Sequence, residues 1–199
     1  MGKVILNVTM SLDGFVAGAD VGIDQPMGEG GMRLHEWLLE VPQNDVDTAV
    51  ANEIHASASA VVLGKRTFEV GLGLWGDTPF PAPCFVLTHE KRDPLPQTSG
   101  AFFFVNDGVE SAVKQARVAA KGGDVALMGA DIAQQCLRAG LVDEINLQVA
   151  PVLLGNGRRL FEQLGDSDIA LRQLRVVQSP RVAHIRYRVE NTATVNAVD

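Results

Sequence analysis

AVVLGKRTF, residues 60–68, is the most informative pattern in this chain. Its first four residues are apolar and read as a buried strand, after which Gly64 lets the backbone turn tightly into a helix. A helix start exposes unpaired N–H groups and the positive end of the helix dipole, so an anion can bind there. Lys65 and Arg66 add positive charge, and the Thr67 hydroxyl can donate to an oxygen. The pattern is that of a phosphate site, or else of an ordinary solvated Lys-Arg pair at a strand end.

Length and composition predict one globular α/β domain over residues 1–190, followed by a frayed tail at residues 191–199. The chain has 199 residues, enough for one domain with a real core, and 46% hydrophobic against 21% charged residues is typical of a globular protein. Cys84 and Cys136 stand in apolar surroundings. We therefore expect core thiols in a reducing compartment rather than a disulfide.

The charge pattern argues against a nucleic-acid partner. The net charge is −7, with 17 basic against 24 acidic residues, and no basic tract is long enough to follow a nucleic-acid backbone. A local basic site in an acidic protein instead predicts a small anionic ligand. No apolar segment reaches the length of a membrane span and no leader pattern is evident, so we expect a cytoplasmic protein without a membrane partner.

Strand and helix patterns alternate through the first two thirds of the chain. Strands are predicted at residues 3–10, 15–17, 60–63, 84–87, 101–105, 124–128 and 142–150, and a closing hairpin at 169–178 and 182–189. Helices are predicted at residues 34–39, 46–57, 65–71, 109–119 and 130–139. The second of these has Val46, Val50 and Ile54 on one apolar face. The alternation predicts a three-layer α/β sandwich with a mostly parallel central sheet and an antiparallel C-terminal hairpin at its edge.

Three of the predicted strands end in residues that suit an anion. Ligands of such sheets bind outside the carboxyl ends of the strands, and these ends carry residues 64–67, 88–92 and 129–131. One such turn arises readily by chance, whereas three at one edge favour a long ligand with several phosphates, such as a dinucleotide. The glycine-rich residues 18–31 form either a plain long loop or a mobile lid.

Several motifs in order resemble the dihydrofolate reductase superfamily, in particular the branch of the reductase (C-terminal) domain of the bifunctional riboflavin-biosynthesis deaminase/reductase. The matching segments are SLDG at 11–14, GKRT at 64–67, VLTH at 86–89, LVDE at 141–144, Pro151, and LGNGRRLF at 154–161. The resemblance covers about residues 3–189. It implies a dihydrofolate reductase-like fold, a reductase acting on a small molecule, and a homodimer to which residues 145–149 and 155–161 contribute.

The same resemblance implies NADPH as the cofactor. Lys65 would face the adenosine 2′-phosphate, with help from Thr88, His89 or Arg92. The physical reading agrees, because a 2′-phosphate needs a nearby cation and NADH would leave these cations without that partner.

The resemblance assigns the rest of the cofactor to the other turns. The resemblance implies that Thr67 and residues 129–132 hold the pyrophosphate, and that Val16 and Ala17 lie beside the nicotinamide. The implied cofactor-binding residues are Val16, Ala17, Gly64, Lys65, Arg66, Thr67, Thr88, His89, Arg92, Met128, Gly129, Ala130, Asp131 and Ile132.

The chain departs from the family pattern at two places. The family usually has Gly-Gly at the pyrophosphate turn, where this chain has Met128-Gly129. Dihydrofolate reductases proper also carry a buried carboxylate at the start of the helix after the lid, and residues 32–37 offer no clean counterpart. Glu36 is one candidate for the catalytic acid, or a solvated surface residue. Asp13 is the other, as a substrate contact or as a residue that stabilises its own turn.

Two functions follow from these patterns. The first is an NADPH-dependent reductase that transfers a hydride to a small heterocyclic or ring-opened C=N or C=O compound, with pterins and ribosylaminopyrimidines as the family precedents. The alternative is an NADPH-binding protein with little or no reductase activity. No metal site is expected, because the four histidines lack ligand spacing and the chain has no deaminase zinc motif.

Overall fold

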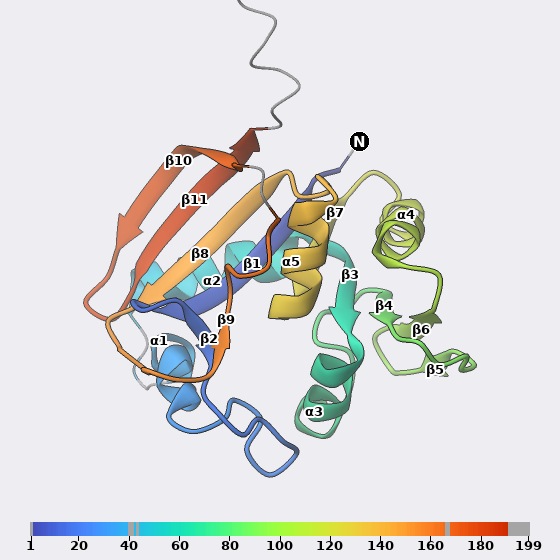
Figure 1. Ribbon diagram of the computed structural model, residues 1–199, viewed down its shortest axis with the longest axis horizontal. Coiled ribbons are helices and arrows are strands. Elements are labelled where there is room, and N and C mark those ends of the chain that lie inside the picture. Colours follow the sequence, from blue (N-terminus) through green and yellow to red (C-terminus); the bar gives the residue numbers. More distant parts are fainter. Residues whose placement is uncertain (1, 40–41, 43, 166–167, 191–199) are drawn as a thin grey trace, which may run out of the picture.

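The computed structural model describes residues 2–39, 42, 44–165 and 168–190, and the predicted frayed tail at 191–199 lies outside these residues. The described chain forms a nine-stranded sheet with helices on both faces, beside a small two-stranded sheet (Figure 1). This is the three-layer α/β architecture that the alternation of strand and helix patterns predicts.

Parallel pairing dominates the large sheet, whose strands lie in the order β10-β11-β8-β1-β7-β3-β4-β6-β5. Their bounds are β1 Val4–Ser11, β3 Ala58–Gly64, β4 Cys84–Leu87, β5 Leu95–Pro96, β6 Ala101–Val105, β7 Asp124–Met128, β8 Glu144–Ala150, β10 Ala170–Gln178 and β11 Ala183–Glu190. Neighbours from β8 to β6 are parallel, whereas β10, β11 and β5 pair antiparallel at the two margins. The mostly parallel sheet and its antiparallel C-terminal hairpin are therefore confirmed. The small sheet pairs β2 (Phe15–Ala17) with β9 (Arg158–Arg159).

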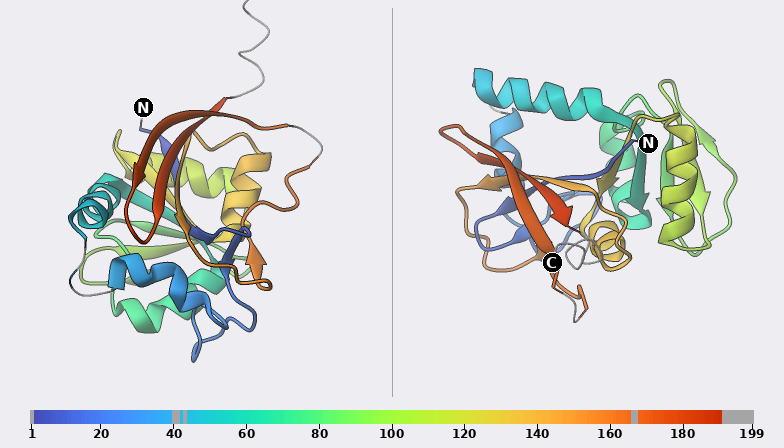
Figure 2. Two further views of the ribbon diagram at one scale, coloured as in Figure 1. Left: turned by 90° about the vertical axis from the view of Figure 1, so that its left-hand side faces the viewer. Right: turned by 90° about the horizontal axis from the view of Figure 1, so that it is seen from above.

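Helices cover both faces of the large sheet. In Figure 1, α5 (Ala130–Arg138) lies in front of the sheet and α2 (Asp45–Ser57) behind it, and Figure 2 shows the same layers from two further sides. The remaining helices are α4 (Val109–Ala119), α3 (Lys65–Trp75) and the short turns η1 (Gly31–His35) and α1 (Glu36–Leu39). The larger core packs α4 and α5 against the strands. Cys84 and Cys136 are buried and free, and burial raises the pKa of both thiols to about 12.

The opposite face of the sheet has an apolar half and a polar half. Under α3, Phe68 packs against Phe102 and Phe104, with ring centroids 4.9 and 5.3 Å apart. Towards α2, this face carries a group of polar strand residues: Asn7, Thr9, Asn146, Gln148, His184 and Arg186. Burying polar groups costs free energy unless each of them finds a partner. This polar half is therefore the part of the core that packing alone does not explain.

The face that α2 turns to the sheet differs from the predicted one. Val46 is exposed, whereas Asp47 is buried with 1% of its surface exposed. Val50 and Ile54 do line the recess beneath the helix. The difference arises because hydrophobic periodicity marks the apolar side of a helix and cannot reveal that the surface beneath it is polar.

Residues 18–31 fold as a compact loop. The Gly18 N–H donates to the Met27 carbonyl and the Glu29 N–H to the Ala19 carbonyl, both over 2.8 Å. A Cβ at Gly28, whose φ is +68°, would lie 2.3 Å from the Ala19 oxygen. Only glycine fits this close approach of two backbones.

The segments expected at a homodimer interface differ in their exposure. β8 lies between β1 and β11, and its residues Ile145 and Leu147 are buried in the larger core. Phe161, in the second segment, is 40% exposed. Among the described helices, none has both the length and the apolar character that crossing a membrane requires.

Candidate cofactor and substrate site

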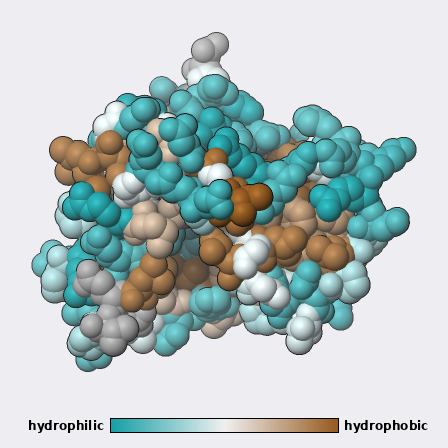
Figure 3. Space-filling view, turned by 90° about the horizontal axis from the view of Figure 1, so that it is seen from below, coloured by the Kyte–Doolittle hydropathy of each residue, from teal (hydrophilic) through white to brown (hydrophobic). Residues whose placement is uncertain are grey.

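The three turns singled out in the sequence leave one edge of the sheet. β3 pairs in parallel with β7 and with β4, and Leu63 lies opposite Met128 while Gly64 lies opposite Leu87. The carboxyl ends of β3, β4 and β7 are therefore neighbours. Figure 3 shows this edge from below, where apolar groups gather across the middle of the face and hydrophilic groups border them.

The turns after β3 and β7 touch each other. Gly129 has a φ of +94°, and a Cβ added to it would lie 2.6 Å from the Thr67 Oγ1. A Cβ on Gly64 would lie 3.6 Å from the Ile132 side chain. The first turns of α3 and α5 are thus side by side, and the family's second glycine position is kept where the contact is tightest.

Both helix starts leave their backbone N–H groups available. Neither Gly64, which precedes α3, nor Gly129, which precedes α5, supplies a side-chain cap. The side chains of Ala130 and Ile132 are buried, so these two residues can face a ligand only with their backbone. Two adjacent, uncapped helix N-termini form an arrangement that suits a pyrophosphate.

Acidic residues accompany these turns. Asp131, on the first turn of α5, is exposed and forms an ion pair with Arg158 on β9. Lys65 forms an ion pair with Glu90 and lies 3.7 Å from the Glu69 carboxylate. The hydrogen bond and charge of Glu90 raise the pKa of Lys65, and Lys65 in turn lowers the pKa of Glu90. Lys65, which is predicted to bind the 2′-phosphate, therefore lies at this edge, and its ammonium group is already paired with a carboxylate.

The other residues implied for the adenosine end also have partners. Arg66 donates to the Val21 carbonyl oxygen over 2.7 Å and so fastens the 18–31 loop to α3. The guanidinium of Arg92 lies 4.4 Å from the centre of the Phe104 ring. Thr88 is buried, and its hydroxyl accepts from the Glu90 N–H over 3.1 Å. His89 is exposed beside this turn.

Val16 and Ala17, implied for the nicotinamide, lie on the short strand β2 beside the same edge. β2 is held by its pairing with β9, in which Ala17 lies opposite Arg158. A Cβ on Gly157 would lie 2.1 Å from the Ala17 oxygen. The LGNG segment therefore packs directly on the strand that the resemblance assigns to the nicotinamide.

Asp13 connects two loops through its carboxylate. It accepts hydrogen bonds from the Leu154 N–H at 3.1 Å and the Gly155 N–H at 2.7 Å. A hydrogen bond with the Ser11 side chain, together with these backbone donors, lowers the pKa of Asp13 to about 2. Its interactions are those of a residue that joins the SLDG turn to the LGNG turn, and a substrate contact for it stays a prediction.

Glu36 begins α1 on the outside of the molecule. Half of its side chain is exposed, and its carboxylate lies 3.9 Å from Arg33 one turn earlier. This contact is the arrangement of a solvated surface ion pair. Glu36 is therefore not the buried carboxylate of the family pattern.

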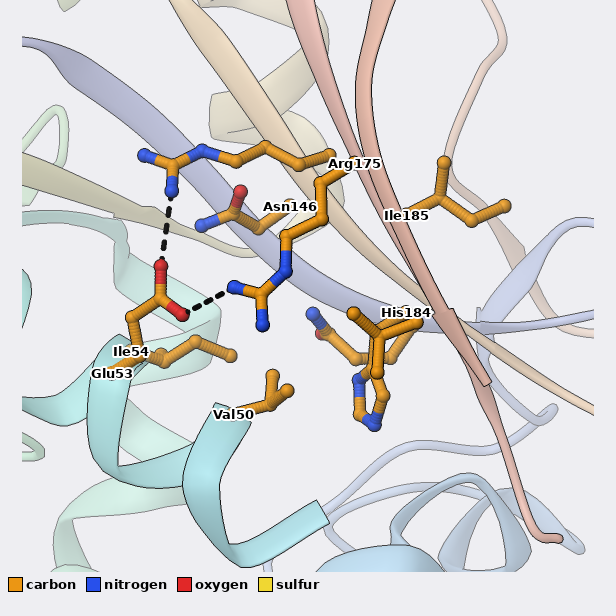
Figure 4. Close-up of a pocket in the computed structure, with 10 residues that line it drawn as sticks. Val50, Glu53, Ile54, Asn146, Arg175, His184 and Ile185 are labelled. Carbon is orange, nitrogen blue, oxygen red and sulfur yellow. Dashed lines mark hydrogen bonds and ion pairs between the residues drawn. The ribbon is translucent and has the colours of Figure 1, made fainter. Parts of the chain in front are cut away.

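The polar half of the sheet borders a recess under α2 (Figure 4). The recess has an empty volume of about 340 Å³, its open mouth included. Glu53 bridges two guanidinium groups across its rim, at 2.9 Å from Arg175 and 3.0 Å from Arg186. Burial opposes the ionisation of Glu144 behind Arg186, but hydrogen bonds from Lys3 and Arg186 outweigh that effect and lower the pKa of this carboxyl.

A buried acid–base pair closes the inner side of this recess. Asp47 and His184 are 1% and 5% exposed, and the His184 Nε2 lies 2.8 Å from an Asp47 carboxylate oxygen. Among the described residues, the other oxygen of Asp47 and the Nδ1 of His184 have no hydrogen-bond partner. The Trp37 ring packs edge-on to His184 at 5.1 Å and donates to the Thr9 hydroxyl at 3.2 Å.

Sequence reasoning missed this pair because its members are 137 positions apart. Asp47 in a first helical turn reads as a residue that favours the helix dipole, and His184 reads as one polar position of an edge strand. The available signal was the family's buried carboxylate at the start of a helix, which Asp47 fits better than Glu36 because it lies in the first turn of α2 and is buried.

Residues 2–185 match the family model of the RibD C-terminal domain. The chain belongs to this family. It is 26% identical over 172 residues to the uncharacterized protein YyaP of Bacillus subtilis, a match that covers 80% of each chain. The RibD family assignment agrees with the SLDG, GKRT and LGNG motifs read from the sequence.

Solved structures support the fold. A Shewanella sp. PV-4 protein whose name assigns it provisionally to riboflavin biosynthesis has a TM-score of 0.74 at 21% identity, over 95% of this chain and 99% of its own. Dihydrofolate reductase from Enterococcus faecalis has a TM-score of 0.57 at 15% identity, over 96% and 98%. The dihydrofolate reductase-like fold of the riboflavin-reductase branch is confirmed, and with it a reductase-type architecture.

The contact between Gly129 and Thr67 predicts a specific cost for a side chain at position 129. Gly129→Ala combines a positive φ with a Cβ 2.6 Å from Thr67, whereas Gly122 has a φ of +95° and open space around it. We expect Gly122→Ala to lower the free energy of unfolding by about 1–3 kcal/mol from backbone strain alone, and Gly129→Ala to lower it further.

Urea denaturation measures both effects. Thr67→Ala combined with Gly129→Ala is expected to cost less than the sum of the two single changes, because the clash is absent. Equal losses for Gly122→Ala and Gly129→Ala, with additive effects in the double variant, would show that the two turns do not press on each other.

The hydrogen bonds of Asp13 predict a pH dependence of stability. Its pKa is about 2 in the folded protein against an ordinary value of 3.8, so its contribution is complete above pH ~4 and is lost as the pH falls towards 2. Asp13→Asn is expected to be less stable than the wild type at neutral pH, and the difference is expected to shrink over that acid range. Asp24→Asn, at an exposed loop position, serves as the control, and thermal melts as a function of pH provide the measurement.

Proposed function

We propose that this protein is an NADPH-dependent reductase that transfers a hydride to a small heterocyclic or ribosylaminopyrimidine- or pterin-like compound. The observation that supports this most is the pair of uncapped helix starts, α3 and α5, which meet at Gly129 and Thr67. A pyrophosphate needs several N–H donors and room for its oxygens close to a backbone. The E. faecalis dihydrofolate reductase, which has the same fold, is described as complexed with NADP(H).

The residues along the edge fit the parts of this cofactor. The N–H groups at the starts of α3 and α5 would hold the pyrophosphate, and Gly129 keeps the space beside Thr67 open. Lys65 lies at the end of β3, where it would meet the adenosine phosphate. β2 would carry Val16 and Ala17 along the nicotinamide, and the 18–31 loop, fastened by Arg66 to Val21, would cover it and exclude water.

The dihydronicotinamide supplies the hydride, and this chain has to supply or relay the proton. We assign that role to Asp47 and His184 in place of Glu36, because they are buried, in contact with each other, and next to a recess. The Nδ1 of His184 is buried and has no hydrogen-bond partner among the described residues, and in this proposal it is the nitrogen that would give its proton to the nitrogen or oxygen of the reduced C=N or C=O bond. Asp47 would orient the ring through its contact with the Nε2.

Titration of the purified protein with NADPH tests the cofactor assignment. We expect a saturable change in nicotinamide fluorescence in the wild type and in Gly122→Ala, and a much weaker one in Gly129→Ala. A panel of pterins, aminopyrimidines and small imines is then tested for NADPH oxidation. Binding with turnover supports the reductase, binding without turnover supports the alternative of an NADPH-binding protein, and the absence of binding would refute both.

The proton assignment is tested with the most active compound of that panel. Asp47→Asn and His184→Gln are expected to lower kcat by about 10²–10⁴-fold, to change the pH profile of kcat, and to leave the affinity for NADPH unchanged. Glu36→Gln is the matched control and is expected to keep wild-type kcat. A large loss in Glu36→Gln with near-normal Asp47 and His184 variants would return the role to Glu36.

A further inference from the structure

Lys65 is held by carboxylates although the sequence assigns it to a phosphate. Its ammonium group forms an ion pair with Glu90 at the end of β4 and lies 3.7 Å from Glu69 on the next turn of α3. The backbone of Glu90 is held in place, because its N–H donates a hydrogen bond to the buried Thr88 hydroxyl. The carboxylate therefore stands where β3 and β4 end side by side, as expected from the pairing of Gly64 with Leu87.

Two of the neighbouring cations, Arg66 and Arg92, have other partners. Arg66 is turned to the Val21 carbonyl oxygen, and Arg92 lies over the rings of Phe104 and Phe68 at 4.4 and 5.4 Å. A 2′-phosphate at this edge therefore has to compete with Glu90 for its main cation, and its negative charge comes close to that carboxylate. A ribose 2′-hydroxyl meets no such repulsion and can donate a hydrogen bond to Glu90, as acidic residues at strand ends do in NAD-binding folds.

We propose that Glu90 is the residue that sets the cofactor selectivity of this protein, and that it allows NADH to bind with an affinity close to that of NADPH. This inference rests on the proposed dinucleotide site and widens its expected cofactor from NADPH alone to NADPH and NADH. Glu90 acts by holding Lys65 away from a 2′-phosphate and by accepting from a 2′-hydroxyl. Glu69 is farther from Lys65 and on the helix rather than at the strand end, so its part in the selectivity is smaller.

The experiment compares the dissociation constants of NADPH and NADH in the full-length wild type, Glu90→Gln and Glu69→Gln, by nicotinamide fluorescence. In the wild type the two constants are expected to lie within about tenfold of each other. Glu90→Gln removes the repulsion and frees Lys65, so NADPH is expected to bind on the order of tenfold more tightly and NADH no better than before. Glu69→Gln is expected to change the logarithm of the ratio of the two dissociation constants by less than half of the change that Glu90→Gln causes.

The outcomes distinguish a failure of the role of Glu90 from a failure of the proposed dinucleotide site. If both dinucleotides bind and the ratio of their dissociation constants in Glu90→Gln is within twofold of the wild-type ratio, Glu90 does not set the selectivity. The dinucleotide site itself would then still stand. A wild type that prefers NADPH by more than a hundredfold also overturns it. If neither dinucleotide binds to any variant, the proposed function fails together with this inference. Glu90 is exposed, so Glu90→Gln is expected to keep the wild-type melting temperature, which shows that its effects on binding arise in the folded protein.

Discussion

The parallel pairing of β3 with both β7 and β4 is the constraint on which the rest of this structure depends. Because the three strands run in the same direction and in fixed register, their carboxyl ends and the turns that follow are forced together. The contact of Gly129 with Thr67 is the consequence at atomic scale. The N-termini of α3 and α5 are therefore adjacent, and their unpaired N–H groups face the same region.

The face of the sheet beneath α2 and α3 has an apolar part and a part that contains buried polar and charged groups. Under α3, aromatic rings pack as in any core. Under α2, the protein buries Asp47, His184 and Glu144. A hydrophobic core of the same volume would be at least as stable, because desolvation of charged groups is costly even when they are paired. Buried titratable groups beside a recess are candidates for chemistry.

The sequence determined the central elements well and the site only in part. The bounds of β4, β6, β7 and α4 agree with the predicted ranges, because each is a local apolar pattern between clear breaks. β5 and β9 have two residues each, too few to show any period. The partners of Lys65 and the burial of Asp47 could not be predicted, since each depends on a residue from a distant segment, Glu90 in one case and His184 in the other. The motif residues were found because the family pattern encodes the backbone of the turns, whereas ion pairs among variable side chains leave no local signal.

The cofactor edge and the recess under α2 are separate features, and α1 is the element that connects them. Trp37 on α1 donates to the hydroxyl of Thr9, near the carboxyl end of β1, and its ring packs on His184 at the inner side of the recess. β1 continues directly into the SLDG turn and β2, where Asp13 holds the LGNG turn in place. A shift of the turns at the cofactor edge would therefore be transmitted through Thr9 and Trp37 to the imidazole. Under the proposed function, the pair that would supply the proton and the edge that would hold the cofactor are joined by packed side chains and hydrogen bonds of β1, α1 and β11, which is what a reaction requires when both groups must reach the same double bond.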